Sequence, residues 1–390
     1  MRYELLMKNS LICKFIQEVY KHSNSIPLHE PIFTGLEREY VLDTLASTFV
    51  SSVGEYVTRF EQAICSHTGS PHAVAVTNGT SALHLALQCT GVQTNDLVIT
   101  QSFTFVATCN AIAKLGARPI FCDISTDTLS LCPSSLSKFL SENAYVKNKQ
   151  CFLKQTNQRI KAVLPVHTFG HPGEITELVE ICHFWKLELI EDAAEALGST
   201  YKKKHVGTFG RFGIISFNGN KIITTGAGGV ILCQNAEDAK LLRHISSTGK
   251  IPHKYQFFHD IEAFNFRMPN INAALGLAQI ENLELFLKSK KEIATSYEKF
   301  FLNSEIKFFK EPIHARSNYW LNAIAFQTAD DCNSFLEFAN ENGISARAAW
   351  TPMHHLPMYR DDLCDNLANT DKIAKRIANI PSSPLIDANA

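Results

Sequence analysis

Short β-rich runs alternate with helical patterns between residues 70 and 234, and this alternation limits the folds open to the chain. Several runs are continuously apolar, as strands of a parallel sheet are when both faces are buried. Helical patterns separate the earlier runs, whereas the last two follow each other too closely for a crossover helix and predict an antiparallel pair. We therefore expect a doubly wound α/β domain with a large, mostly parallel sheet. The predicted strands are residues 73–76, 97–100, 119–123, 162–166, 187–190, 213–217 and 230–232.

The length of the chain predicts more than one domain. A single hydrophobic core rarely grows beyond ~250–300 residues, and this chain has 390. Apolar spacing near the start predicts one or two short amphipathic helices over residues 1–25, ahead of a large α/β domain over residues 26–270. A connecting helix up to residue 301 and a small α/β domain are expected over residues 271–390. The elements predicted there are strands at residues 320–326 and 346–350 and helices at residues 331–342 and 370–377.

Charge and hydropathy exclude several classes of protein. The formal net charge is −1 and the longest basic block is the lysine triplet at residues 202–204, so the basic footprint of a nucleic-acid-binding protein is missing. No apolar run approaches the ~18 residues of a membrane span, and the N-terminus lacks the apolar core of a signal peptide. Eleven cysteines without a C-x-x-C pair predict reduced thiols. We expect a cytoplasmic protein that binds neither nucleic acid nor membrane.

No metal site is predicted. His354 and His355 are adjacent, so we expect their side chains to diverge, and no third ligand at zinc spacing is evident. A structural role is favoured for this pair over a contact to a ligand.

Residues 77–83 (Thr-Asn-Gly-Thr-Ser-Ala-Leu) follow a predicted strand and open a predicted helix. Backbone N–H groups are free at a helix N-terminus and the helix dipole favours an anion, so this segment predicts a phosphate cradle. The same letters are also typical of a turn followed by a helix cap. Taken alone, the segment leaves both interpretations open.

Two further segments supply an acid and an amine. Asp192 stands at the carboxyl end of a buried-looking strand, followed by small residues, and could contact a flat ligand or merely cap a helix. Lys221 closes residues 216–221 (Ser-Phe-Asn-Gly-Asn-Lys) ahead of a glycine-rich stretch. Such a lysine is either solvated or, where burial lowers its pKa, a nucleophile. A phosphate cradle, an aspartate and a later lysine are together the parts of a pyridoxal phosphate site.

The chain resembles the DegT/StrS-type nucleotide-sugar aminotransferases, which are fold-type I pyridoxal phosphate enzymes. The resemblance extends from residue 26 to about residue 384, and it is closest to the branch that serves the bacillosamine and legionaminic acid pathways. The segments that carry it are residues 49–54, 78–84, 102–108, 190–198, 216–221, 265–269 and 350–354.

The resemblance implies a role for each matched position. Lys221 matches the Schiff-base lysine, Asp192 the partner of the pyridine nitrogen, and Phe105 the aromatic side chain over the cofactor ring. Asn265 matches a phosphate ligand that arrives from the other subunit of a homodimer. The remaining cofactor-binding positions, which include the phosphate contacts, are Gly79, Thr80, Ser81, Ser216 and Asn218.

Two positions fit the pattern less simply. Glu195 stands where many members of the family have glutamine near the phenolic oxygen of the cofactor, and two like charges there repel unless one is protonated. His167 resembles an active-site histidine of the family, and a buried structural histidine fits its surroundings equally well. Both are kept as candidate site residues, His167 as a catalytic one.

The activity implied by the resemblance is transamination. An amino acid, by resemblance L-glutamate, would donate its amino group to the 4-keto group of a nucleotide-linked 4-keto-6-deoxyhexose, with a UDP-N-acetylamino sugar expected, for surface-glycan synthesis. One alternative is a pyridoxal phosphate-dependent nucleotide-sugar dehydratase, but members that deoxygenate carry histidine in place of the lysine, so Lys221 argues against it. The other alternative is a non-catalytic regulatory protein on the same fold.

Overall fold

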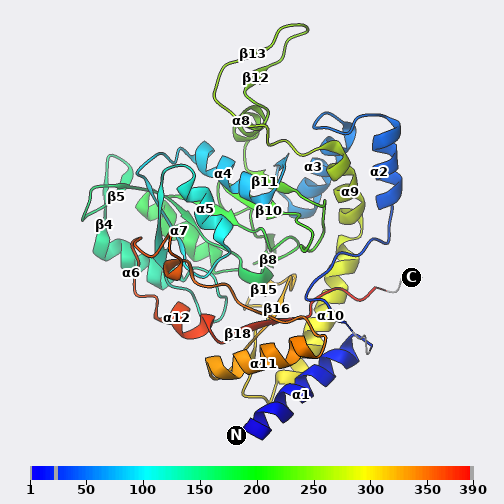
Figure 1. Ribbon diagram of the computed structural model, residues 1–390. Helices are drawn as coiled ribbons and strands as arrows, with labels where there is room; N and C mark the ends of the chain where they lie inside the picture. The colour runs from blue at the N-terminus through cyan, green and yellow to red at the C-terminus, as the bar shows by residue number, and fades with distance from the viewer. Residues whose placement is uncertain (1, 22–24, 387–390) are drawn as a thin grey trace.

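The computed structural model describes residues 2–21 and 25–386, and a nine-stranded mixed sheet forms its centre (Figure 1). Its main path runs in the order β1-β11-β10-β7-β6-β2-β3. The five strands from β10 to β3 are parallel, whereas β11 runs antiparallel to both of its neighbours. The predicted antiparallel pair, β10 with β11, is confirmed. The bounds are β1 His72–Val76, β2 Leu97–Gln101, β3 Arg118–Cys122, β6 Arg159–Leu164, β7 Glu188–Asp192, β10 Phe212–Ser216 and β11 Gly229–Cys233.

An antiparallel hairpin that the sequence patterns did not predict adds the other two strands. Strand β4 (Ala144–Lys147) pairs with β5 (Gln150–Leu153), and β5 pairs with the start of β6. Asn148 and Lys149 connect the two strands with positive φ angles of 50° and 61°, as a two-residue type I′ turn requires. The sheet is therefore more mixed than the expected mostly parallel one.

Helices cover both faces of the sheet because successive strand residues point to opposite sides. Val74 and Val76 pack with Leu242 in the core on one face, whereas Ala73 and Ala75 belong to the core on the other. The first face carries α4 (Gly79–Thr90), α5 (Val106–Ala113) and α8 (Ala236–Ser246). The second carries α3 (Glu55–Thr68), α6 (Pro133–Asn143), α7 (Ile175–Trp185) and α9 (Asn270–Glu281), and α2 (Glu37–Ala46) packs on α9. The expected doubly wound arrangement is confirmed.

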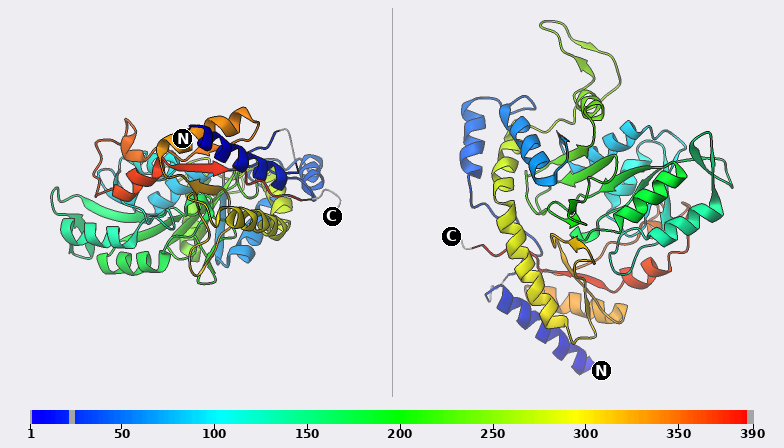
Figure 2. Two further views of the ribbon diagram at one scale, coloured as in Figure 1. Left: turned by 90° about the horizontal axis from the view of Figure 1, so that it is seen from below. Right: turned by 180° about the vertical axis from the view of Figure 1, so that it is seen from behind.

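A smaller α/β unit follows the large one. The predicted helix over residues 271–301 is two helices, α9 and α10 (Leu283–Phe301), which meet at Asn282. Helix α10 runs from the large unit to a four-stranded antiparallel sheet (Figure 2). This sheet contains β14 (Lys307–Phe308), β16 (Asn322–Ala325), β17 (Arg347–Ala348) and β18 (Ile377–Ile380), with α11 (Ala329–Glu341) on it and α12 (Ala368–Ala374) ahead of β18.

The N-terminal extension is a single helix, α1 (Arg2–Val19), which packs on the small unit (Figure 2). Ile12 and Ile16 are buried in one apolar cluster with Tyr297 of α10 and Phe335 of α11. These contacts explain the apolar spacing that the sequence shows in this segment.

A two-stranded hairpin, β12 (Lys250–Ile251) with β13 (Phe258–His259), extends away from the body of the molecule (Figure 1). Its side chains include the exposed aromatics Tyr255, Phe257 and Phe258. A three-stranded sheet joins β15 (Ala315–Arg316), β8 (Thr200–Tyr201) and β9 (Lys204–His205), and the short 3-10 helices are η1 (Thr168–Gly170) and η2 (Met353–His355). In the described part of the chain, no helix combines the length and apolar character needed to cross a membrane.

Candidate active site

The candidate site lies where β7 and β10 end and α4 begins. Asp192 is the last residue of β7 and Ser216 the last of β10, and these two strands are parallel neighbours. Gly79, the first residue of α4, packs on Ser216: a Cβ atom at Gly79 would lie 3.0 Å from the Ser216 Cβ. Polar groups from separate segments therefore meet at the carboxyl edge of the sheet, as in other open α/β folds.

The N-terminus of α4 is shaped as an anion site. Asn78 caps the helix by accepting a hydrogen bond of 2.8 Å from the Ser81 N–H. A Cβ atom at Gly229, the first residue of β11, would lie 2.6 Å from the Asn78 carbonyl carbon, so only glycine lets β11 approach this turn so closely. Thr80 is exposed beside the mostly buried Ser81. Free amides, two hydroxyls and the positive end of a helix dipole suit a phosphate group.

Asp192 is a buried carboxylate held by two donors. Thr108 Oγ1 donates to its Oδ2 over 2.8 Å, and the Ala194 N–H donates to its Oδ1 over 3.2 Å. Burial raises the pKa of Asp192, and the hydrogen bonds and the nearby Lys221 partly offset this shift. A cationic group placed against Asp192 would relieve the cost of burying its charge.

Lys221 points into the same buried region. Its Nζ lies 3.6 Å from Glu195 Oε1 and 3.7 Å from the centre of the Trp320 indole ring. Burial lowers the pKa of Lys221, although Glu195 and Asp192 act in the opposite direction. The indole N–H of Trp320 donates to the Asn220 carbonyl over 2.6 Å, which fixes the chain next to the lysine. Trp320 is a positioning residue that the sequence analysis missed.

Glu195 is tuned toward its neutral form. Its Oε2 accepts a hydrogen bond of 2.8 Å from the N–H of Phe169, a residue with a positive φ of 56°. Burial raises the pKa of Glu195 to about 7, with Lys221 acting against the shift. The protonated form of Glu195 is more populated near pH 7 than that of an ordinary glutamate, and this form lacks the like-charge repulsion expected beside a phenolate.

Aromatic side chains form the side of the site next to the small unit. Phe105, the residue before α5, is 52% exposed, and its ring centre lies 6.3 Å from that of Trp350. Trp350 also contacts Phe103 and Phe169, with ring centres 5.9 and 4.9 Å away. An exposed ring with support behind it is suited to stacking on a flat ligand.

His167 lies in a different environment from the other candidates. It is fully buried, with its Nε2 3.1 Å from Glu191 Oε2 and its Nδ1 accepting from the Gly173 N–H. Glu191 and Asp192 are consecutive in β7, so their side chains point to opposite faces of the sheet. Both nitrogens of His167 are thus engaged by structural partners, which favours the structural interpretation over a catalytic one.

Two further candidates are exposed. Asn218 donates to the Asn220 side chain over 3.1 Å. Asn265 follows the β12–β13 hairpin and forms a backbone bridge with Ser247 after α8. Neither makes a described side-chain contact with Asp192 or Lys221 in the single chain.

The chain belongs to the DegT/DnrJ/EryC1/StrS aminotransferase family, whose profile matches residues 32–390. It is 37% identical over 359 residues to the GDP-perosamine synthase of Escherichia coli O157:H7, which covers 92% of this chain and 93% of that protein. It is also similar to the structure of PseC, an aminotransferase of Helicobacter pylori involved in pseudoaminic acid biosynthesis (TM-score 0.82, 25% identity, 92% of this chain and 93% of that one). The pyridoxal phosphate form of Spr1654 from Streptococcus pneumoniae shares the fold (TM-score 0.83, 23% identity, 94% and 95% coverage).

These comparisons show a pyridoxal phosphate-dependent sugar aminotransferase of nucleotide amino-sugar biosynthesis, and family membership assigns the fold to fold-type I. The described residues fit the cofactor. The α4 N-terminus suits its phosphate, Asp192 is a buried carboxylate that suits a protonated ring nitrogen, and Lys221 is a buried amine.

Proposed function

We propose that this enzyme transfers the amino group of an amino acid, L-glutamate in the first instance, to the 4-keto group of a nucleotide-linked 4-keto-6-deoxyhexose. The observation that carries the proposal is the buried Lys221 amine, with Glu195 3.6 Å away and Asp192 close enough to shift its pKa. A cytoplasmic location belongs to the same proposal. All eleven cysteines are free thiols, the form that the cytosol maintains.

Lys221 and Asp192 take the two central roles in this proposal. When bound, the cofactor supplies an electron-withdrawing ring that stabilises negative charge at the reacting carbon. Asp192 would hold a proton on the ring nitrogen, because its buried carboxylate gains a cationic partner there. The Nζ of Lys221 would anchor the cofactor between turnovers and, once free, move a proton at the reacting carbon. The lowered pKa of Lys221 supports this role, since a general base must be unprotonated near neutral pH.

Other residues would hold and orient the cofactor. We assign its phosphate to Thr80, Ser81 and Ser216, around the N-terminus of α4, and keep Gly79 and Asn218 as further cofactor-binding positions. Phe105 would stack on the ring, with Trp350 limiting its movement from behind. The neutral form of Glu195 would donate a hydrogen bond to the phenolic oxygen. His167 would keep the end of β7 in place through Glu191 and takes no part in the chemistry.

A homodimer with shared sites completes the proposal. Asn265 is exposed and makes no described contact with its own chain's Lys221, which fits a ligand for the partner's phosphate. Exposed apolar side chains on α2, in the loop after it and on the β12–β13 hairpin support an interface, because an interface would bury them. They are Leu42, Leu45, Phe49, Val53, Tyr255, Phe257 and Phe258.

Two nucleotides, UDP and GDP, are candidates for the carrier of the sugar substrate. The resemblance to the bacillosamine and legionaminic acid branch favours a UDP-N-acetylamino sugar. The relative at 37% identity is instead named for GDP-perosamine, which makes a GDP-linked sugar the competing substrate. Both belong to the same chemical class, so the proposed reaction does not depend on the choice.

A turnover screen tests the function. Purified holoenzyme is incubated with UDP-, GDP- and dTDP-linked 4-keto-6-deoxy sugars and glutamate labelled in its amino nitrogen, and the products are examined by mass spectrometry. We expect the label in one amino sugar and an equal amount of keto acid. A deoxygenated sugar without label would indicate a dehydratase. Nucleotide-sugar binding without any turnover would indicate a regulatory protein.

A further inference from the structure

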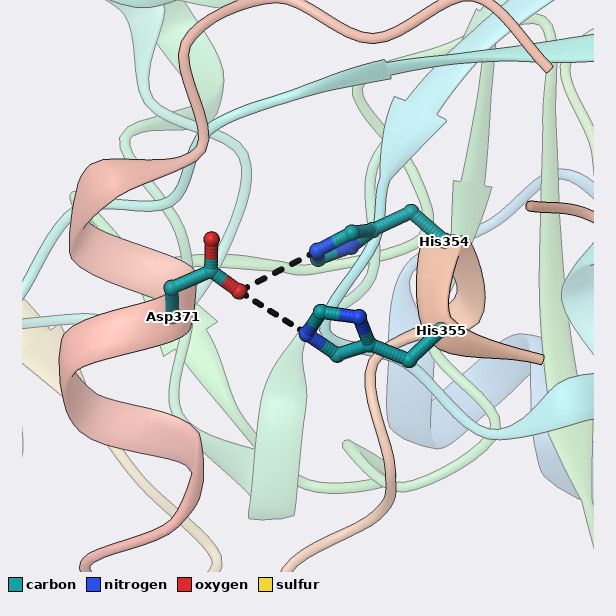
Figure 3. A group of neighbouring side chains, drawn as sticks. All are labelled: His354, His355 and Asp371. Atoms are coloured by element: carbon teal, nitrogen blue, oxygen red, sulfur yellow. Dashed lines mark hydrogen bonds and ion pairs between the residues drawn. The ribbon is translucent and has the colours of Figure 1, made fainter. Parts of the chain in front are cut away.

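His354 and His355 converge on one carboxylate outside the cofactor site (Figure 3). Their Nε2 atoms lie 3.1 and 3.0 Å from the same oxygen, Oδ1 of Asp371 in α12. The two rings lie against each other at an angle of 45°, with centres 3.9 Å apart. The expectation that these neighbouring side chains diverge without a third ligand is therefore wrong. The short helix η2 turns both rings to one side, and α12 supplies the third group from a segment 16 residues away.

The spacing of the three groups is close to that of a zinc ligand set. All three ligand atoms lie within 4.8 Å of one another. Zinc at ~2.0–2.2 Å from nitrogen and oxygen ligands holds them about 3.3–3.6 Å apart in a tetrahedron. The two histidine-to-aspartate distances would thus expand by only a few tenths of an ångström. His355 and Asp371 are 42% and 52% exposed in their side chains, which leaves them room to move and leaves a fourth position open to solvent.

The surroundings of His354 suit a metal ligand. Its Nδ1 lies 2.6 Å from Ser102 Oγ, and the same oxygen accepts a hydrogen bond from the His354 backbone N–H. A hydroxyl can also accept a hydrogen bond from an Nδ1–H group, and in that tautomer the lone pair of Nε2 is directed at the Asp371 side. Such a second hydrogen bond typically fixes the ring of a metal-bound histidine.

We propose that His354, His355 and Asp371 bind a divalent transition metal ion of the zinc class, with one coordination position left to water or an added ligand. Two imidazoles and a carboxylate form a donor set that zinc uses in proteins. The ion would join η2 to α12 and, through Ser102, to the end of β2. Because Ser102 precedes Phe105 by three residues, the ion would stiffen the loop at one side of the cofactor site.

The competing interpretation is a metal-free cluster in which each imidazole donates its Nε2 proton to Asp371. Equilibrium dialysis of tag-free holoenzyme against zinc sulfate, followed by elemental analysis, separates the two. We expect the wild type to bind about one more zinc ion per chain than an Asp371→Asn variant, whose side chain has the same shape but no charge. His355→Ala should bind zinc about 100-fold or more weakly, because even the loss of an outer hydrogen bond costs roughly 10–100-fold. Ser102→Ala, which removes only the outer hydrogen bond, should weaken zinc binding by roughly 10–100-fold.

Two control variants exclude zinc bound elsewhere. His183→Ala removes an exposed histidine of α7 and should leave the zinc content unchanged. Cys364→Ser removes an exposed thiol close enough for the Asp371 charge to raise its pKa, and should also leave the zinc content unchanged. Bound-cofactor absorbance and circular dichroism verify that each variant is folded. Equal zinc uptake by wild type, His355→Ala and Asp371→Asn, or no uptake by wild type, would overturn the proposal.

Discussion

Lys221 Nζ lies over the indole ring of Trp320, 3.7 Å from the ring centre, and the same indole donates to the carbonyl of the residue before the lysine. The backbone of Trp320 is held in turn by Lys290, whose buried Nζ donates to its carbonyl over 3.3 Å. Trp320, a residue of the small unit, thus positions the proposed catalytic amine of Lys221 in the large unit.

Trp320→Phe should weaken the positioning of Lys221 while an aromatic side chain remains at this place. The phenyl ring keeps an aromatic face under Lys221 but removes the indole hydrogen bond to the Asn220 carbonyl, a loss of about 0.5–1.5 kcal/mol. We expect a lower free energy of unfolding in urea and slower cofactor attachment, measured by absorbance. Trp185→Phe, a similar change in α7 away from the site, serves as the control. Equal effects of the two substitutions would contradict the positioning role of Trp320.

Lys221→Ala should abolish turnover and covalent attachment of the cofactor, while the phosphate site around α4 still binds it non-covalently. Borohydride treatment of wild type followed by peptide mapping should label Lys221, and dialysis should remove the cofactor faster from the variant. Label on any other lysine would show that the assignment is wrong.

Asp192→Asn should keep the fold and slow the half-reaction with glutamate. An amide cannot stabilise a protonated ring nitrogen as a carboxylate does. A loss on the order of 10²-fold corresponds to a few kcal/mol of barrier. Single-turnover spectroscopy measures this step directly, and Asp330→Asn at an exposed position of α11 is the control. A wild-type rate for Asp192→Asn would remove Asp192 from the mechanism.

The raised pKa of Glu195 predicts that the stability of the cofactor-free enzyme depends on pH. Its pKa in the folded chain is about 7, against 4.5 for an ordinary glutamate, so between these values the folded state binds more protons than the unfolded state. The stabilising contribution of Glu195 to the free energy of unfolding is therefore fully present below about pH 4.5 and is lost as the pH rises through about 7. Glu195→Gln, which keeps a neutral side chain, should raise the Tm relative to wild type more at pH 8 than at pH 5. A difference that is the same at both pH values would contradict the raised pKa.

The sequence predicts those parts of the site that depend on local order along the chain. Asp192 and Lys221 were identified because each follows a strand, and strand ends meet at one edge of a parallel sheet. Trp320 was missed because it lies about 100 residues from Lys221 and is brought there only by packing of the small unit. The convergence of His354 and His355 was missed for the same reason, since their third partner belongs to another helix.

The missed elements of the fold also have physical causes. Strands β4 and β5 are short and carry exposed polar residues, and their turn uses Asn148 and Lys149 without the glycine that usually marks a type I′ turn. The predicted helix over residues 271–301 contains no proline or glycine near its break at Asn282 that would signal two helices. Regular alternation and apolar period predicted the seven strands on the main path of the large sheet, because burial on a sheet face repeats along the sequence.

The last prediction concerns sites shared between two chains. If Asn265 binds the phosphate in the partner's site, a two-fold axis creates two composite sites in each dimer. Unfolding Lys221→Ala with an equal amount of Asn265→Ala and refolding the mixture makes about half the dimers mixed, each with one intact and one doubly damaged site, so roughly a quarter of wild-type activity should return. The pair Lys221→Ala with Asp192→Asn is the control. Both of its changes affect groups of one chain's own site, so no intact site can form and no activity should return. If native mass spectrometry confirms mixed dimers and the Asn265 pair recovers no more than its parents, the sites lie within single chains.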